Sequence, residues 1–165
     1  MMVTGTLADF CQMASEKIGL IVEMIERKAT RISVVQIGFL PDEFLEPAND
    51  LGRKMLSVVP VFKEKTLHEW NYQVCVRFDK TFGSKTELTN SIITLSRNTV
   101  TLQKTSDNST LRVKEVVHGS IDINTIPENT EDRFTSEDVS SFFRLAPEWH
   151  NELTSDATSY FTERE

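Results

Sequence analysis

The residues of this sequence that could do chemistry are few and scattered. Its three histidines, His68, His118 and His150, stand apart, and none belongs to an HExxH motif or to a Cys/His cluster. The six glycines are isolated, so the sequence has no Gly-rich loop to cradle a phosphate. Cys75 would need a neighbouring base to act as a nucleophile, and the sequence indicates none. We therefore expect no catalytic residue, no metal site and no cofactor.

A small basic patch is the first candidate binding site. Arg112 and Lys114 share one face of an expected strand with His118, and Arg97 and Lys104 would extend the patch. Such a patch would suit a phosphate or an acidic peptide, whereas the alternative is an ordinary solvated face. Residues 1–117 carry a net charge of only +1, which argues against general binding to nucleic acid.

The acidic C-terminal end is the second candidate site. Residues 118–165 hold eleven Asp and Glu against three Arg. Large side chains stand among these acids, and they are the candidate partner-binding residues: Phe142, Phe143, Leu145 and Trp149. Acidic segments with aromatic residues often fold onto partner grooves, and this spacing also looks like the short motif that docks on ubiquitin-like autophagy modifiers. The alternative is a helix that packs back on the domain and completes its own core.

The composition is that of a folded domain. The chain has 165 residues, of which 39% are hydrophobic and 26% charged, with a net charge of −7. It contains no apolar run long enough to span a bilayer and does not begin with the pattern of a secretory signal. Two distant cysteines, Cys11 and Cys75, fit a reducing compartment. We expect a cytoplasmic protein, with the nucleus as an alternative.

The first half of the chain predicts a helix, a strand and a weaker helix. Residues 6–28 have a capping box at Thr6 and Asp9 and two apolar stripes, which predict a helix buried between layers with Ile21 in the core. Residues 31–39 predict a strand with Val35 and its alternate neighbours on one face. Residues 42–56 predict a short or broken helix, because Pro47 and Gly52 interrupt it.

The middle of the chain predicts a hairpin over residues 57–79. Its second arm alternates strictly between apolar and polar residues, so that Trp70, Tyr72, Val74, Val76 and Phe78 share one buried face, and Trp70, Tyr72 and Val74 belong to the core. Residues 85–104 are ambiguous, because apolar residues recur at helical spacing among poor helix formers. We favour a helix over 85–97 that runs into a strand near 99–105. The alternative is a hairpin that turns at residues 97–98.

The last part predicts a strand over 110–117, an irregular loop over 118–134 and two short helices. The first helix starts at a capping box of Thr135 and Asp138, and the second starts at Pro147. Together these elements predict an α+β fold, with an antiparallel hairpin sheet packed on a long central N-terminal helix. We expect a domain over 1–123 followed by an acidic segment over 124–165.

Two stretches resemble the HORMA domain. The strand over 67–74, LHEWNYQV, is similar to the family's Trp-containing strand, and residues 87–102 are similar to the helix-into-strand segment that follows it. The Pro-containing link at 38–43 and the strand that ends at Gly119 look nearest to the autophagy-initiation adaptors. The resemblance implies a non-enzymatic adaptor and scaffold in the cytoplasm. It would form a heterodimer with another HORMA subunit and help to assemble the autophagy-initiating kinase complex.

Other functions remain open at this point. A checkpoint or DNA-repair HORMA adaptor would instead close a mobile C-terminal segment over a bound peptide. A nucleic-acid or phosphate-binding α+β module would use the basic patch at Arg112 and Lys114. An enzyme is the third class, and it would depend on Cys75.

Overall fold

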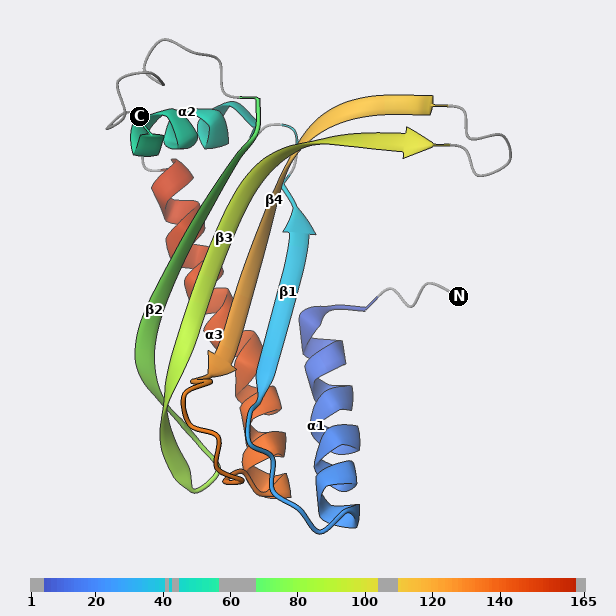
Figure 1. Cartoon of the computed structure of the whole chain (residues 1–165), viewed down its shortest axis with the longest axis vertical. Coiled ribbons are helices and arrows are strands. Elements are labelled where there is room, and N and C mark those ends of the chain that lie inside the picture. The colour runs from blue at the N-terminus through green and yellow to red at the C-terminus, as the bar shows by residue number, and fades with distance from the viewer. Residues whose placement is uncertain (1–4, 41, 43–44, 57–67, 104–109, 163–165) are drawn as a thin grey trace. The chain divides into compact units, whose positions relative to one another are not determined.

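The computed structural model describes the whole chain except residues 1–4, 41, 43–44, 57–67, 104–109 and 163–165 (Figure 1). The strands form a four-stranded antiparallel sheet in the order β1-β4-β3-β2, which confirms the α+β class. No helix among the described residues is long and apolar enough to cross a membrane. The elements in chain order are α1 (Leu7–Met24), β1 (Ser33–Phe39), α2 (Leu45–Leu56), β2 (Trp70–Phe82), β3 (Lys85–Gln103), β4 (Thr110–Thr125) and α3 (Ser136–Thr162).

The chain divides into two compact units, and all four strands contribute to both. Unit 1 contains residues 1–36, 75–92 and 121–165, and unit 2 contains residues 37–74 and 93–120. The expected boundary at 123/124 therefore does not separate two bodies. Residues on both sides of it belong to unit 1, together with α1 and α3.

Helix α1 begins where the sequence predicted. Thr6 is the N-cap: its hydroxyl accepts from the Asp9 N–H at 3.1 Å, and its own N–H donates to the Asp9 carboxylate at 2.9 Å. The helix packs against α3 through small residues, and a Cβ on Gly19 would lie 2.2 Å from Ser140 Oγ. Only one side of α1 is covered. Ile21 lies on the other side, so its assignment to the core was wrong.

Helix α3 is a single helix of 27 residues, so the prediction of two short helices was wrong. The capping box at its start is confirmed, because the N–H and hydroxyl of Thr135 both donate to Asp138 Oδ2. Burial alone would raise the pKa of Asp138, but these bonds and one from Ser84 hold that pKa below its usual value. Ala146 before Pro147 and Trp149 two residues after it are buried, and their packing keeps the helix continuous despite the missing N–H.

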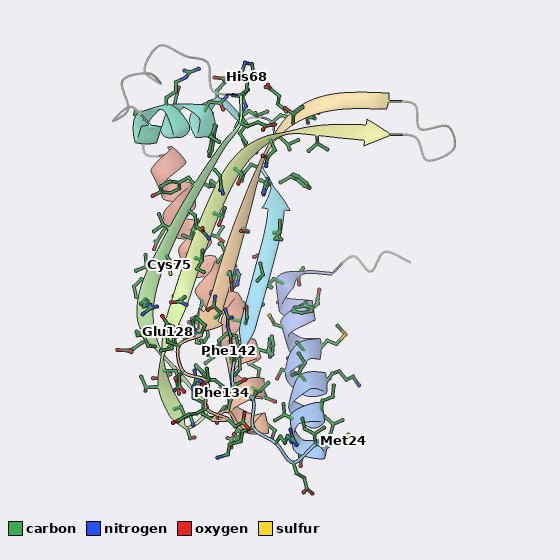
Figure 2. The ribbon with its side chains drawn as sticks, viewed as in Figure 1. Met24, His68, Cys75, Glu128, Phe134 and Phe142 are labelled. Carbon is green, nitrogen blue, oxygen red and sulfur yellow. The ribbon has the colours of Figure 1, made fainter. Side chains whose placement is uncertain are left out.

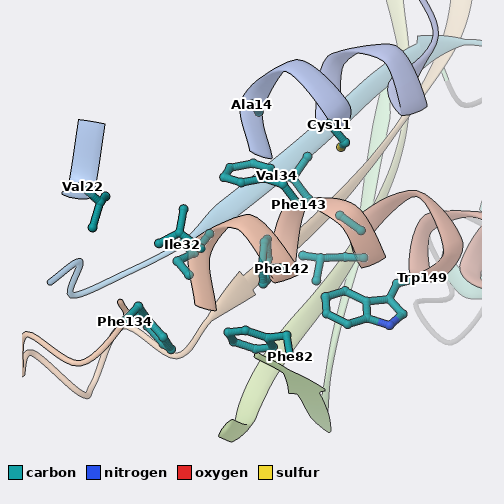
Figure 3. Packing of buried hydrophobic residues seen from close by; sticks show 13 residues of the cluster. Cys11, Ala14, Val22, Ile32, Val34, Phe82, Phe134, Phe142, Phe143 and Trp149 are labelled. Carbon is teal, nitrogen blue, oxygen red and sulfur yellow. The ribbon is translucent and has the colours of Figure 1, made fainter. Parts of the chain in front are cut away.

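Aromatic rings from distant parts of the chain form the core of unit 1 (Figure 3). Phe82 of β2 lies 5.3 Å from Phe142 and 5.7 Å from Phe134, measured between ring centroids. Phe142 lies 5.5 Å from Trp149 on the same helix. The two pairs that include Phe142 are edge-to-face, and such packing adds to the free energy gained by burial. The core therefore joins β2, the loop before α3, and α3 itself.

Strand β3 runs without interruption for 19 residues. The predicted helix over 85–97 was wrong, and so was the alternative turn at residues 97–98. The chain turns earlier, at Gly83, whose φ of 58° favours glycine. Polar residues of β3 bond to the neighbouring strand, as when Thr89 donates to the Phe78 carbonyl and Ser96 to Asn71. These bonds satisfy side chains that a helix would have placed in water.

Strand β4 is longer than the predicted strand over 110–117. It continues to Thr125, through residues expected in a loop. Val117 and Ile123 are buried along it, and the Thr125 N–H donates to the Ile32 carbonyl at 3.0 Å. Within unit 1, Ile32, just before β1, and Val34 of β1 are buried, whereas Val35 is exposed. The sequence predicted the strand but not which of its faces is covered.

The core of unit 2 forms between α2 and the sheet. Trp70 is buried against Ala48 and Val117, which confirms its core assignment, and Tyr72 is half-buried and packs beside them. Val74 is half-buried. Val76 and Phe78, further along β2, are exposed, so the prediction that they continue its buried face was wrong. Gly52 brings α2 close to the indole, because a Cβ there would lie 3.1 Å from Trp70 Cε2. The first arm of the predicted hairpin lies outside the described residues.

Candidate functional site

The aromatic residues of the acidic end are not a docking motif in this structure. Phe142, Phe143 and Trp149 are buried in the core of unit 1, and Leu145 packs against it. Their assignment as partner-binding residues is corrected accordingly: the segment completes its own core. The sequence could not show this, because the ring that fills the space between them is Phe82, from β2.

Those cations of the basic patch that the structure describes are already paired. Lys114 Nζ contacts both carboxylate oxygens of Asp42, at 2.6 and 2.8 Å. Arg97 is buried and donates to Asn49 at 2.9 Å and also to Glu115. The side chains of Arg112 and Lys104 lie outside the described residues. The described cations of the patch are therefore already neutralised, and the phosphate-binding alternative loses this support.

The thiols and histidines form no reactive group in the part of the chain that the structure describes. Cys75 is exposed on β2 (Figure 2), and no hydrogen bond links it to a base there. Cys11 is buried, and burial raises the pKa of its thiol. His118 lies 3.2 Å from the Asn98 amide. Within the described ranges, no three His, Cys, Asp or Glu side chains are placed to hold a metal ion.

His150 is a fully buried titratable group on α3. Neither ring nitrogen makes a well-formed hydrogen bond with the described residues, although the ring lies near the backbone of Val34. Burial lowers the pKa of His150, and the Val34 backbone and the Asp122 carboxylate oppose this only in part. The folded chain therefore holds this histidine neutral.

The burial of His150 predicts a loss of stability in mild acid. Unfolded His150 takes up a proton near its usual pKa of 6.5, whereas folded His150 stays neutral to a lower pH. The contribution to stability is complete above the unfolded pKa and is lost as the pH falls toward the lowered folded pKa. His150→Leu should reduce the fall in melting temperature between about pH 7 and about pH 5. The exposed His68, changed to leucine, is the matched control and should leave that fall unchanged.

The outer side of α1 carries a site that the sequence did not reveal. Its large apolar side chains are about half exposed or more, with exposed fractions of 48% for Phe10, 54% for Met13, 51% for Leu20, 55% for Ile21 and 73% for Met24. We call these five residues the α1 stripe, and Figure 2 shows Met24 at its C-terminal end. The sequence did show a second apolar stripe on this helix. It assigned the stripe to the core, because spacing alone does not say what covers a helix face.

Acidic residues border the α1 stripe on one side. Glu16 and Glu23 are exposed there and line a shallow groove of about 450 Å³ between α1 and α3. The groove is also lined by Glu137 and by a single basic residue, Arg144. Asp9 does not line this groove: its carboxylate accepts from Thr6 at the start of the helix, and these bonds lower the pKa of its carboxyl. The candidate site therefore consists of the apolar α1 stripe and the acidic residues along one side of it.

The α1 stripe lies on a helix that hydrogen bonds hold against α3. Ser15 donates to the Ser140 carbonyl at 3.0 Å, and Ser140 donates back to the Ser15 carbonyl at 2.9 Å. Together with the capping box and the close approach at Gly19, these bonds hold α1 to α3 in one orientation. An apolar face held in this way can bind a partner without the entropic cost of ordering the helix on binding.

Comparison with known proteins identifies no relative. The chain matches no protein-family model, and neither the curated proteins nor the solved structures show a significant match to it.

Proposed function

We propose that this chain is a non-enzymatic adaptor that binds another protein through the α1 stripe. The observation that carries this proposal is the exposure of five large apolar side chains on one side of an ordered helix. The largest contiguous apolar patch on a folded chain often marks the surface that meets a partner. The rest of α1 contributes to a core, so the exposed stripe is not needed for packing within unit 1.

The size of the α1 stripe agrees with this role. Five side chains of about 200 Å² each, roughly half exposed, offer on the order of 500 Å² of apolar surface. A standard protein interface buries about 800 Å² per partner and surrounds an apolar centre with a polar rim. The stripe would supply the centre, and the charged residues beside it would supply part of the rim.

A narrower proposal rests on the resemblance to the HORMA domain. In that form the chain is a scaffold subunit that pairs with another HORMA subunit in the autophagy-initiating kinase complex. The strand at Trp70 supports it, whereas residues 87–102 form a continuous strand and lack the helix that the resemblance implied. A checkpoint or DNA-repair adaptor is the alternative within the same class. The identity of captured subunits would distinguish these forms.

Affinity capture with a disrupted stripe tests the proposal. The tagged full chain and its Met13→Glu/Leu20→Glu variant would be compared by mass spectrometry. We expect the variant to lose the partner proteins held by the wild type while its melting temperature changes little, because surface substitutions typically cost about 0.5 kcal/mol or less.

The matched control places two glutamates on exposed positions of another helix. Asn151→Glu/Ser155→Glu adds the same charge to α3, away from the stripe, and should keep the partners. Retention of the same partners by the Met13→Glu/Leu20→Glu variant would show that the stripe is not the docking surface, and the proposal would fail.

A further inference from the structure

The spacing of the α1 stripe suits another helix. Phe10, Met13, Leu20 and Met24 follow one another at intervals that fit the a and d positions of a heptad repeat, with Lys17 at the remaining a position. These four apolar residues of the α1 stripe are all exposed, and the opposite side of the helix is buried in unit 1. An unpartnered a/d stripe of three turns or more is the surface that an amphipathic helix recognises.

The two edges of this stripe differ in charge. In the same heptad, Glu16 and Glu23 occupy the g positions, and both are exposed. The e positions on the other edge are Ala14, which is buried, and Ile21. Glu137 of α3 adds a third carboxylate on the acidic side, across the groove. Residues at e and g positions determine which helix can pair and in which direction.

This charge pattern argues against a second copy of the chain. In an antiparallel pair the g edges face each other, so Glu16 and Glu23 would meet the same carboxylates of the other copy. In a parallel pair each g edge faces an e edge, so the carboxylates would be buried against Ile21. The antiparallel pair costs free energy because like charges repel. The parallel pair costs free energy because the unpaired carboxylates lose their hydration.

We infer that the α1 stripe binds an amphipathic helix of a partner protein that carries lysine or arginine along one edge. This inference rests on the proposed adaptor function and specifies its partner. The basic edge of the partner would lie against Glu16, Glu23 and Glu137, and its apolar face would cover Met13, Leu20 and their neighbours. Lys17 lies in the middle of the stripe. An apolar partner residue opposite Lys17 would remove water from its ammonium group, so Lys17 selects a partner with one acidic residue at that position.

Two designed peptides test the inference with the full chain. Both would be three-heptad helices with leucine at a and d and a glutamate at the central a position. One would carry lysine along its edges and the other glutamate. Titrations followed by amide and methyl NMR shifts should place the basic peptide on Met13, Leu20 and Met24. The acidic peptide should bind at least about tenfold more weakly.

Charge reversal supplies the decisive comparison. Glu16→Lys/Glu23→Lys should invert the preference, so that the acidic peptide binds better than the basic one. Glu131→Lys/Asp132→Lys makes the same change in charge at exposed loop positions of unit 1 and should leave the preference as in the wild type. Equal binding of both peptides, no binding of either, or an unchanged preference after charge reversal would overturn the inference.

Other occupants of the stripe give distinct results. A dimer in sedimentation equilibrium that Leu20→Glu dissolves would assign the stripe to a second copy, and co-sedimentation with phosphatidylserine vesicles would assign it to a membrane surface. Either result overturns the inference. If partner capture depends on Met13 and Leu20 but the peptides show no charge preference, the adaptor function stands and only the basic partner is rejected.

Discussion

Phe142→Ala should lower the free energy of unfolding by about 3 to 5 kcal/mol, which is the usual cost of emptying a fully buried aromatic site. Phe142 is completely buried, and the rings of Phe82, Phe143 and Trp149 surround it at centroid distances between 5.3 and 5.7 Å. Because these rings come from β2 and α3, they cannot collapse into the cavity without moving the helix on the sheet. The measurement is urea denaturation followed by circular dichroism.

Phe10→Ala is the matched control for that experiment. It makes the same chemical change on α1, where the ring is about half exposed, and should cost about 1 kcal/mol or less. If Phe142→Ala were as stable as the wild type, the aromatic end would not be part of the core. Its interpretation as a partner-binding motif would then regain support.

Trp70→Ala should have an effect of similar size, about 3 to 5 kcal/mol, in unit 2. The indole is buried against Ala48 and Val117, and Gly52 brings the α2 backbone against its ring. Trp70 Nε1 has no hydrogen-bond partner among the described residues, so the cost comes from lost packing and not from a lost bond. Trp70→Phe should therefore cost clearly less than Trp70→Ala.

Hydrogen exchange would locate the effect of the Trp70 variants. Trp70→Ala should speed exchange of the α2 amides more than that of α1, because α2 packs on Trp70 and α1 belongs to unit 1. Equal exchange of α2 in the wild type and in Trp70→Ala would show that the indole does not hold that helix. The predicted core of the hairpin would then be wrong.

Local patterns in the sequence were sufficient to predict the structural features that depend only on residues close together in the chain. Thr6 with Asp9, and Thr135 with Asp138, predicted both capping boxes, because each requires only a side chain and a backbone group three residues apart. The strict alternation after Trp70 predicted β2, since a period of two is a direct consequence of strand geometry. The helix over 42–56 was also predicted, although Pro47 and Gly52 do not break it.

Residues 85–103 show where local patterns fail. Their apolar residues recur at helical spacing, yet the segment forms one long strand. Its Thr, Ser and Asn side chains decide the outcome through bonds to other strands, as when Asn90 donates to Asn124 across the sheet at 3.1 Å. Such bonds exist only after β2 and β4 are in place. The sequence contains both residues of each hydrogen-bonded pair but does not show that they lie close together in the fold.

The candidate site divides in the same way. The sequence by itself determined that α1 is a capped helix with two apolar stripes and that the acidic end contains large aromatic residues. Only the tertiary structure decided which of these surfaces is free. Phe82 and Phe134 reach the aromatic end and bury it, whereas α3 covers only one side of α1 and leaves Met13, Leu20 and Met24 exposed. Burial depends on which distant side chains arrive at a surface, and no local spacing carries that information.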